Sequence, residues 1–267
     1  EVDAVPEPEK PTDLSYGTYI ESDLDQNTPV YEPGIATYAV LPFSFPDEMD
    51  KFYATYPSNR NQNPYGTCWA VSSIGPAEFD LINDLAGRGD FDNSLDLSEL
   101  QLAYFTYNSV LDPLGGTEGD YTKYYNENAS VSYLNYGGNY AMAARRLAGW
   151  CGAVQESLVP YSQAAETVAR GLDSSYAYNQ DVAHLENAYM INIRQNSSDV
   201  KQQIMEHGAV GVMYYHADEA MGWNSTLGQY TYYDSALTGG GHAVMIVGWD
   251  DQFSKNNFTA EEKPSSD

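Results

Sequence analysis

The chain is poor in cysteine and in positive charge, and it has no long apolar run. Two of its 267 residues are cysteines, Cys68 and Cys151, which excludes a scaffold held together by several disulfides. Only 12 Lys and Arg oppose 38 Asp and Glu, so the formal net charge is −26. Because phosphate binding requires a basic surface, neither nucleic acid nor an anionic membrane is expected as a partner. No apolar stretch approaches the roughly 20 residues of a membrane-spanning helix, so we expect no transmembrane segment.

The rest of the composition is that of a folded protein. Hydrophobic residues make up 42 % of the chain, enough for one large domain or for two lobes around a cleft. No signal peptide is recognisable, which leaves a cytosolic chain or a processed, secreted one. The abundance of tyrosine, 24 residues, and the scarcity of Lys and Arg favour an extracellular or cell-surface location.

The N-terminal segment differs from the remainder of the chain. Residues 1–38 are acidic, contain five prolines and show no sustained periodicity, so we predict an extended Pro-rich arm there. An apolar run begins near Ile35 and continues to Pro46. It marks the start of a folded domain, which we predict over residues 39–267.

The apolar pattern after Cys68 predicts a mostly buried helix over residues 68–85. Thr67 stands at the N-cap position, where a hydroxyl accepts a hydrogen bond from the first turn. Gly75 and Pro76 lie inside the pattern, so we expect a kink or a restart there. The two glycines at 87 and 89 are typical of a helix end.

Further elements follow downstream. Helices are predicted over residues 140–147 and 198–207, and strands over residues 209–215 and 242–249. The last of these segments has few polar atoms, so we expect a strand that is buried on both faces.

Cys68 is the strongest candidate for a catalytic residue. A thiol at a helix N-terminus has a lowered pKa and forms the nucleophilic thiolate more readily, although a single cysteine is more often a small buried hydrophobe. Gln62 lies six residues upstream and Trp69 follows directly. A cysteine nucleophile needs a base that is distant in sequence and close in space, and His242, at the start of the apolar strand, is the candidate.

These segments resemble the active-site sequences of papain-like (cathepsin-type, C1 family) cysteine proteases. Gly66, Cys68 and Trp69 match the family signature Cys-Gly-Ser/Ala-Cys-Trp/Tyr, while Tyr65 replaces its first cysteine. The run from His242 to Trp249 resembles the family's His-Ala-Val-x-x-Val-Gly block. The segments Leu97–Leu102 and Glu156–Tyr161 resemble two further family stretches, Leu-Ser-Glu-Gln-x-Leu and Glu-Ser-x-x-Pro-Tyr. In the first of them a short helix starts in the family, and Ser98 is a natural N-cap.

The resemblance implies an α+β fold with two lobes. A helical lobe with the Cys-bearing helix at its centre would occupy about residues 62–170. A β-barrel-like lobe carrying His242 would occupy about residues 171–258 with part of residues 39–61. The arm over residues 1–38 is then either a propeptide remnant or an uninvolved tail.

The resemblance also implies a thiol endopeptidase that acts on proteins or peptides. Cys68 would form the acyl-enzyme as a thiolate paired with the His242 imidazolium, and His242 would serve as general base and acid. The side-chain amide of Gln62 and the backbone N–H of Cys68 would hold the oxyanion. No metal and no cofactor are implied.

The substrate-binding residues implied by the family are of two kinds. Gly137 and Gly138 would pair with the extended substrate backbone, which a Cβ atom would keep at a distance. The remaining residues would form the walls that contact the substrate: Trp69, Tyr140, Met213 and Ala243.

One family motif is missing. The family orients its histidine with an Asn-Ser-Trp-Gly segment on a later strand, and no such segment follows His242 here. We therefore expect a chain that lacks its last strands, or the larger part of a two-chain enzyme. A C-terminal segment or a second chain would then carry the missing strand.

Other functions remain open at this stage. The missing motif favours a catalytically impaired papain-like scaffold that acts as a binding or assembly protein. A cell-wall amidase or a transglutaminase-type Cys/His enzyme also combines a cysteine at a helix start with a histidine on a strand. The disulfide-poor sequence indicates a bacterial, secreted or cell-surface member. Cys151 is expected in the core, and His184, His207 and His216 at surface or structural positions.

Overall fold

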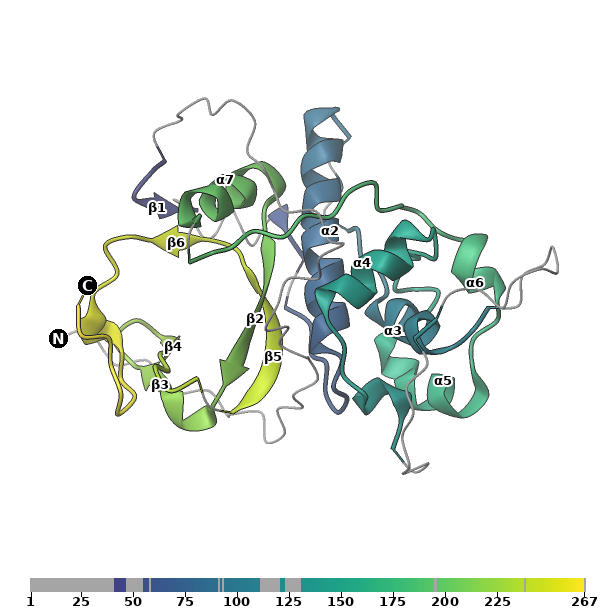
Figure 1. Ribbon diagram of the computed structural model, residues 1–267. Helices are drawn as coiled ribbons and strands as arrows, with labels where there is room; N and C mark the ends of the chain where they lie inside the picture. The colour runs from purple at the N-terminus through teal and green to yellow at the C-terminus, as the bar shows by residue number, and fades with distance from the viewer. Residues whose placement is uncertain are drawn as a thin grey trace.

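The structure is a computed structural model, and it describes residues 41–46, 55–57, 59–90, 92, 94–110, 121–122, 131–194, 196–237 and 239–266. The predicted arm over residues 1–38 lies outside the described residues. Helices and strands segregate into two lobes with α2 (Cys68–Gly87) between them (Figure 1).

The helical lobe packs around the buried face of α2. Its core is formed by large apolar side chains of α2 and α3, among them Trp69, Ile74, Leu100 and Leu102. Four more helices complete it: α3 (Glu99–Tyr107), α4 (Tyr140–Ala148), α5 (Ala164–Arg170) and α6 (Ser175–Tyr178). Short 3₁₀ turns lie at η1 (Tyr133–Asn135) and η2 (Tyr161–Gln163).

Among the described elements, the strand lobe has antiparallel strand pairs and one α-helix. Strand β2 (Val210–His216) pairs with β5 (Gly240–Ile246), and Tyr214 lies opposite His242. Strand β3 (Met221–Asn224) pairs with β4 (Gln229–Tyr232), and β1 (Ser44–Phe45) pairs with β6 (Trp249–Asp250). The remaining elements are α7 (Ser197–His207), η3 (Asp218–Ala220) and η4 (Lys255–Asn257).

The structure shows no restart of the first helix at Gly75 and Pro76. Helix α2 continues through Pro76 to Gly87. Gly75 has a packing role instead, because a Cβ atom built there would lie 2.3 Å from Met245 Sδ on β5. The glycine therefore lets the helix approach the strand.

The expected cap on the same helix is also wrong in part. Thr67 does stand at the N-cap position, but its side chain makes no capping hydrogen bond. Its hydroxyl lies 2.6 Å from the Tyr161 hydroxyl instead. Helix α3, in contrast, begins as expected, since the Ser98 side chain accepts from the Gln101 N–H.

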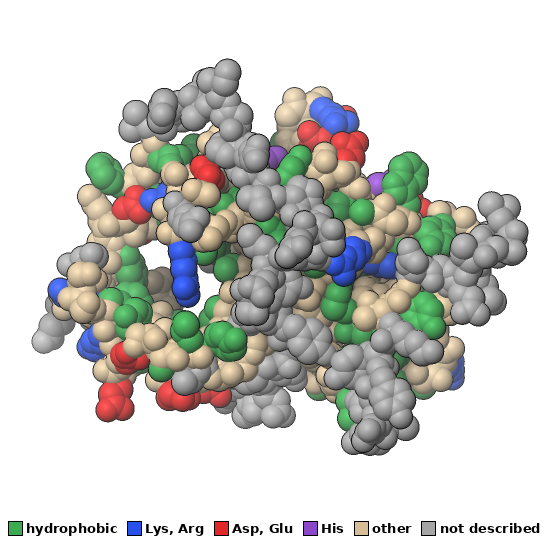
Figure 2. All heavy atoms as spheres, viewed as in Figure 1, with side chains coloured by type: hydrophobic (Ala, Val, Ile, Leu, Met, Phe, Trp, Pro, Cys, Tyr) green, Lys and Arg blue, Asp and Glu red, His purple; other side chains and the backbone are tan. Residues whose placement is uncertain are grey.

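The run over residues 242–249 does not form a strand buried on both faces. Strand β5 ends at Ile246, and of its residues Ala243 is buried while the others are half-buried. Within the part of the chain that the structure describes, β5 pairs with β2 alone, so its other edge carries no strand. The space-filling view shows the strand lobe hollowed (Figure 2).

Candidate active site

Cys68 is the first residue of α2, and both Cys68 and Cys151 are free thiols. Partial positive charge at a helix N-terminus favours an anion, so this position suits a thiolate. The side chain is 1 % exposed and belongs to the main core cluster together with Ala243 of β5. The structure therefore places the thiol at the contact between the two lobes.

Helix α2 and strand β5 run side by side in the same direction. The Tyr140 hydroxyl lies 2.9 Å from Ser72 Oγ on the helix and 2.9 Å from the Val244 carbonyl oxygen on the strand. One turn further along the helix, Gly75 contacts Met245, the next strand residue. The helix and the strand therefore run in the same direction, and Ser72 and Val244 lie at the same height along their common axis.

This alignment brings Cys68 and His242 to the same end of the contact. Cys68 lies four residues before Ser72, a rise of roughly 6 Å along a helix. His242 lies two residues before Val244, roughly 7 Å along a strand. Residues that are 174 positions apart in the sequence therefore lie at one level of the lobe interface.

The environment of His242 is buried and aromatic. Its ring centroid lies 5.8 Å from that of Tyr214 and 5.7 Å from that of His216. Burial, and to a lesser degree His216, lower the pKa of His242 to about 4. The imidazole is therefore neutral at neutral pH, which suits a general base more than a preformed imidazolium.

His216 is a neighbour of the site that the sequence pattern did not reveal. It is 3 % exposed and stacks on Tyr232 with ring centroids 5.2 Å apart. Its Nδ1 lies 2.7 Å from the Tyr214 hydroxyl and its Nε2 lies 3.2 Å from Asp218 Oδ1. The signal that would have found it is the pairing of β2 with β5, which puts residues 216 and 242 on one face.

Gln62 lies in the loop that leads into α2. Its side-chain Nε2 donates to the backbone carbonyl oxygen of Tyr65 at 3.1 Å. The backbone carbonyl oxygen of Gln62 accepts from the Tyr161 hydroxyl. The side-chain amide thus has a fixed orientation in the loop that ends at Cys68.

The two predicted binding glycines are buried against the helix. Gly137 has φ +81°, a conformation that favours glycine. A Cβ atom at Gly138 would lie 2.4 Å from the Trp69 ring, which is 1 % exposed. In this structure close packing against Trp69 is what requires glycine at 138, and pairing with a substrate remains a prediction.

Three of the four predicted wall residues, Tyr140, Met213 and Ala243, lie together beside Cys68. Met213 and Ala243 are directly opposite each other in the β2–β5 pair. Met213 and Tyr140 both pack on the core cluster that contains Cys68 and Ala243. Their contact with a substrate stays a prediction.

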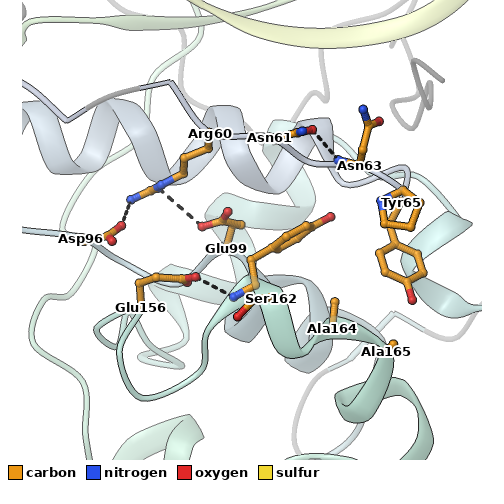
Figure 3. A pocket seen from close by; sticks show the side chains of 12 residues that line it. Arg60, Asn61, Asn63, Tyr65, Asp96, Glu99, Glu156, Ser162, Ala164 and Ala165 are labelled. Carbon is orange, nitrogen blue, oxygen red and sulfur yellow. Dashed lines mark hydrogen bonds and ion pairs between the residues drawn. The ribbon is translucent and has the colours of Figure 1, made fainter. Parts of the chain in front are cut away.

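A separate polar cavity of about 490 Å³ lies in the helical lobe (Figure 3). Arg60 forms ion pairs there with Glu78, Asp96 and Glu99. Burial raises the pKa of Glu78 and of Glu156 to about 7. Neither Cys68 nor His242 is among the residues that line this cavity, but Tyr161 is.

The described residues hold no cluster of His, Cys, Asp and Glu suited to a metal ion. Among the same residues, no helix is both long and apolar enough to cross a membrane. Cys151 is fully buried, and burial raises the pKa of its thiol to about 11, as befits a core cysteine.

Comparison with known proteins agrees with this geometry. A family model described as papain family cysteine protease matches residues 45–262. The chain therefore belongs to the papain family of cysteine proteases. Among curated proteins, the cathepsin B-like cysteine proteinase 3 of Caenorhabditis elegans is 24 % identical over 251 residues. That match covers 90 % of this chain, and this chain spans 62 % of the length of the relative.

Solved structures share the fold. The digestive procathepsin L2 of the Tenebrio molitor larval midgut has a TM-score of 0.57 and 22 % identity, over 90 % of this chain and 66 % of that chain. Xylellain, a cysteine protease from Xylella fastidiosa, has a TM-score of 0.54 and 17 % identity, over 92 % and 84 %. The cysteine protease and lectin-like domains of Cwp84, a surface layer associated protein of Clostridium difficile, have a TM-score of 0.56 and 20 % identity, over 95 % and 47 %. The predicted α+β two-lobe papain-like fold is confirmed.

Proposed function

We propose that the chain is a thiol endopeptidase that cleaves proteins or peptides through an acyl-enzyme on Cys68. The observation that carries the proposal is the parallel packing of α2 on β5, which brings Cys68 and His242 to one level of the lobe interface. The family match supports the class of chemistry. The Gln62 loop, which runs directly into Cys68, supports the oxyanion role.

The proposed reaction begins with a neutral His242. As the sulfur of Cys68 attacks the peptide carbonyl carbon, His242 takes the thiol proton, so the ion pair forms during the attack. The Gln62 amide and the Cys68 N–H donate to the oxyanion. His242 then gives the proton to the leaving amine, and water hydrolyses the thioester with His242 as base again.

The test is the mass of the intact protein after treatment with a peptidyl epoxide, together with cleavage of a fluorogenic peptide amide. The wild-type chain is expected to gain one adduct and to cleave the peptide. Cys68→Ala is expected to lose both, and Cys151→Ala to keep both, because the Cys151 thiol is buried with a raised pKa. An adduct on Cys151, or none, would contradict the proposal.

The same preparation separates the rival functions. Release of peptides from peptidoglycan would favour the cell-wall amidase, and incorporation of an amine into a glutamine-containing protein would favour the transglutaminase. Absence of any thiol-dependent activity with a folded chain would favour the non-catalytic scaffold.

We further propose that a strand from a C-terminal segment or a second chain pairs with the open edge of β5. The support is that β5 pairs with β2 alone among the described residues, and that three of its apolar residues, Val244, Met245 and Ile246, are only half-buried. An unpaired apolar edge is a liability that proteins normally cover. A strand there would lie next to His242, where the family's asparagine is expected.

An extracellular or cell-surface setting is part of the same proposal. The supporting observations are the net charge of −26 and the likeness in fold to a surface layer associated protein and to a digestive proteinase precursor. Detection of the protein in the culture medium or on intact cells of its source would test the setting.

A further inference from the structure

Tyr161 contacts both ends of the loop that leads into the catalytic helix. Its hydroxyl lies within hydrogen-bond distance of the backbone carbonyl oxygen of Gln62 and 2.6 Å from Thr67 Oγ1. Gln62 begins this loop, and Thr67 is the residue before Cys68. A side chain 99 residues further along the chain thus holds the loop from one point.

The direction of the two hydrogen bonds is determined by their chemistry. A carbonyl oxygen accepts and cannot donate, so the Tyr161 hydroxyl gives its one proton to Gln62. It must then accept from the Thr67 hydroxyl. Burial raises the pKa of Tyr161 above its ordinary value of 10.0, so the phenol keeps this proton throughout the neutral range.

The bond to Thr67 has a consequence at the start of α2. Thr67 stands at the N-cap position, where a hydroxyl ordinarily accepts from an N–H group of the first turn. Here the hydroxyl is turned toward Tyr161, and the Thr67 side chain makes no capping bond. Tyr161 thereby fixes the residue whose backbone precedes the Cys68 N–H.

The backbone of Tyr161 is held in turn. Its N–H donates to Glu156 Oε1 at 2.6 Å, and Pro160 restricts the chain immediately before it. Tyr161 is the first residue of the turn η2 and lines the cavity together with Arg60, Glu99 and Glu156. The ring is thus anchored at one end on the helical lobe and reaches the loop with the other.

We propose that Tyr161 is a positioning residue for the oxyanion site, which holds the Gln62 amide and the Cys68 N–H in place through one hydroxyl group. This inference rests on the proposed function and deepens it. One proposed oxyanion donor belongs to Gln62, which Tyr161 contacts directly, and the other to Cys68, which follows Thr67. Displacement of either donor weakens stabilisation of the transition state.

The first experiment is Tyr161→Phe, which removes the hydroxyl and keeps the ring. We expect kcat for a fluorogenic peptide amide to fall about tenfold, with little change in KM. This is less than the roughly 10²–10³-fold loss of kcat that complete removal of an oxyanion donor causes. Alkylation of Cys68 by iodoacetamide forms no oxyanion, so its rate is expected to stay within about twofold of wild type. Equal losses in both rates would mean a general disturbance of Cys68 and would overturn the inference.

The second experiment is a double-mutant cycle with Gln62→Ala. If Tyr161 acts through Gln62, the double variant is expected to lose at most a few-fold beyond Gln62→Ala alone, the remainder coming from the Cys68 N–H. Effects that multiply in full would show that Tyr161 acts elsewhere and would overturn the inference.

Tyr56→Phe is the matched control. The Tyr56 hydroxyl donates to Asn83 Oδ1 at 2.6 Å, a comparable tyrosine bond to the far part of α2. The Tyr56→Phe variant is expected to keep kcat within about twofold of wild type. A tenfold loss of kcat in Tyr56→Phe would show that the effect of Tyr161→Phe is not specific to Tyr161. A wild-type chain that is alkylated at Cys68 but cleaves no peptide would contradict the proposed function itself, a result distinct from a failure of Tyr161→Phe.

Discussion

Glu156 shows how burial of a single carboxyl group couples the stability of this protein to pH. Burial raises its pKa to about 7, opposed by the bond from the Tyr161 N–H and reinforced by Glu99 and Asp96. In an unfolded chain the value is near 4.5. The folded state therefore binds more protons between these values, so the contribution of Glu156 to stability is greatest below about pH 4.5 and is lost as the pH rises through about 7.

Glu156→Gln is expected to reduce this loss. Glutamine keeps an oxygen that accepts from the Tyr161 N–H but carries no charge at any pH. The free energy of unfolding, measured with urea at pH 5 to 8, should fall less steeply with pH in the variant than in the wild type. Glu166→Gln, a change of an exposed carboxyl on α5, serves as the control and should keep the wild-type slope. An equal slope in Glu156→Gln and wild type would refute this expectation.

At the scale of elements, the contact between α2 and the β2–β5 pair depends on Tyr140. Its hydroxyl lies close to Ser72 Oγ on α2 and to the carbonyl oxygens of Val244 and Val212 on the two strands, at 2.9, 2.9 and 3.3 Å. Burial raises the pKa of Tyr140, so the hydroxyl stays protonated. One group from α4 thus joins three elements at the level from which Cys68 and His242 are positioned.

Tyr140→Phe is expected to lower the free energy of unfolding by about 1–3 kcal/mol, because it leaves buried polar atoms without this partner. Urea denaturation followed by circular dichroism measures the change. Tyr178→Phe, at an exposed position on α6, is the control and should change stability by less than about 0.5 kcal/mol. Equal stability of the two variants would show that the Tyr140 hydroxyl does not join the elements.

At the scale of the whole molecule, the two lobes differ in how continuous their cores and sheets are. The helical lobe has a continuous buried core. The strand lobe consists of three separate two-stranded pairs among the described residues, and no described strand pairs with the second edge of β5. Burial of the His242 ring, and to a lesser degree His216, lowers the pKa of His242 to about 4.

Addition of the proposed partner strand as a peptide is expected to change the pKa of His242. A synthetic peptide of about ten residues that places Asn-Ser-Trp-Gly in an alternating apolar strand should bind the β5 edge. An asparagine oxygen that accepts from the imidazolium stabilises the charged form, so the pKa of His242 should rise from about 4. NMR titration of the histidine ring signals, assigned with His242→Gln, measures the shift.

The control peptide carries alanine in place of asparagine. It should bind the same edge through its backbone without raising the pKa of His242. If the asparagine peptide binds and the pKa does not move, the strand does not orient His242, and the proposed partner has another role.

Several features of the site could be predicted from local sequence. The start of α2 at Cys68, the Ser98 cap on α3 and the elements at 140–148 and 197–207 each follow from nearby residues, and the structure confirms them. The family resemblance, carried by Gln62, Cys68 and the block after His242, is also confirmed. The roles of the individual site residues remain predictions.

Other features depend on contacts between distant segments, and no local pattern contains them. From local sequence Gly75 predicts a helix break, but in the structure it allows close packing against Met245. Thr67 likewise predicts a capping bond, but its hydroxyl binds Tyr161 instead. The burial of β5 on both faces was expected from its apolar residues, yet burial depends on which strands flank it.

The sequence by itself determined the nucleophile candidate, the helix that begins at it and the family, because these depend on residue types at short and fixed spacings. The tertiary structure alone decided which histidine neighbours His242, how far its pKa is lowered, and which tyrosine holds the Gln62 loop. The physical reason is that register between strands and contact between lobes result from packing of the whole chain, and a one-residue change in register would place His216 and His242 on opposite faces.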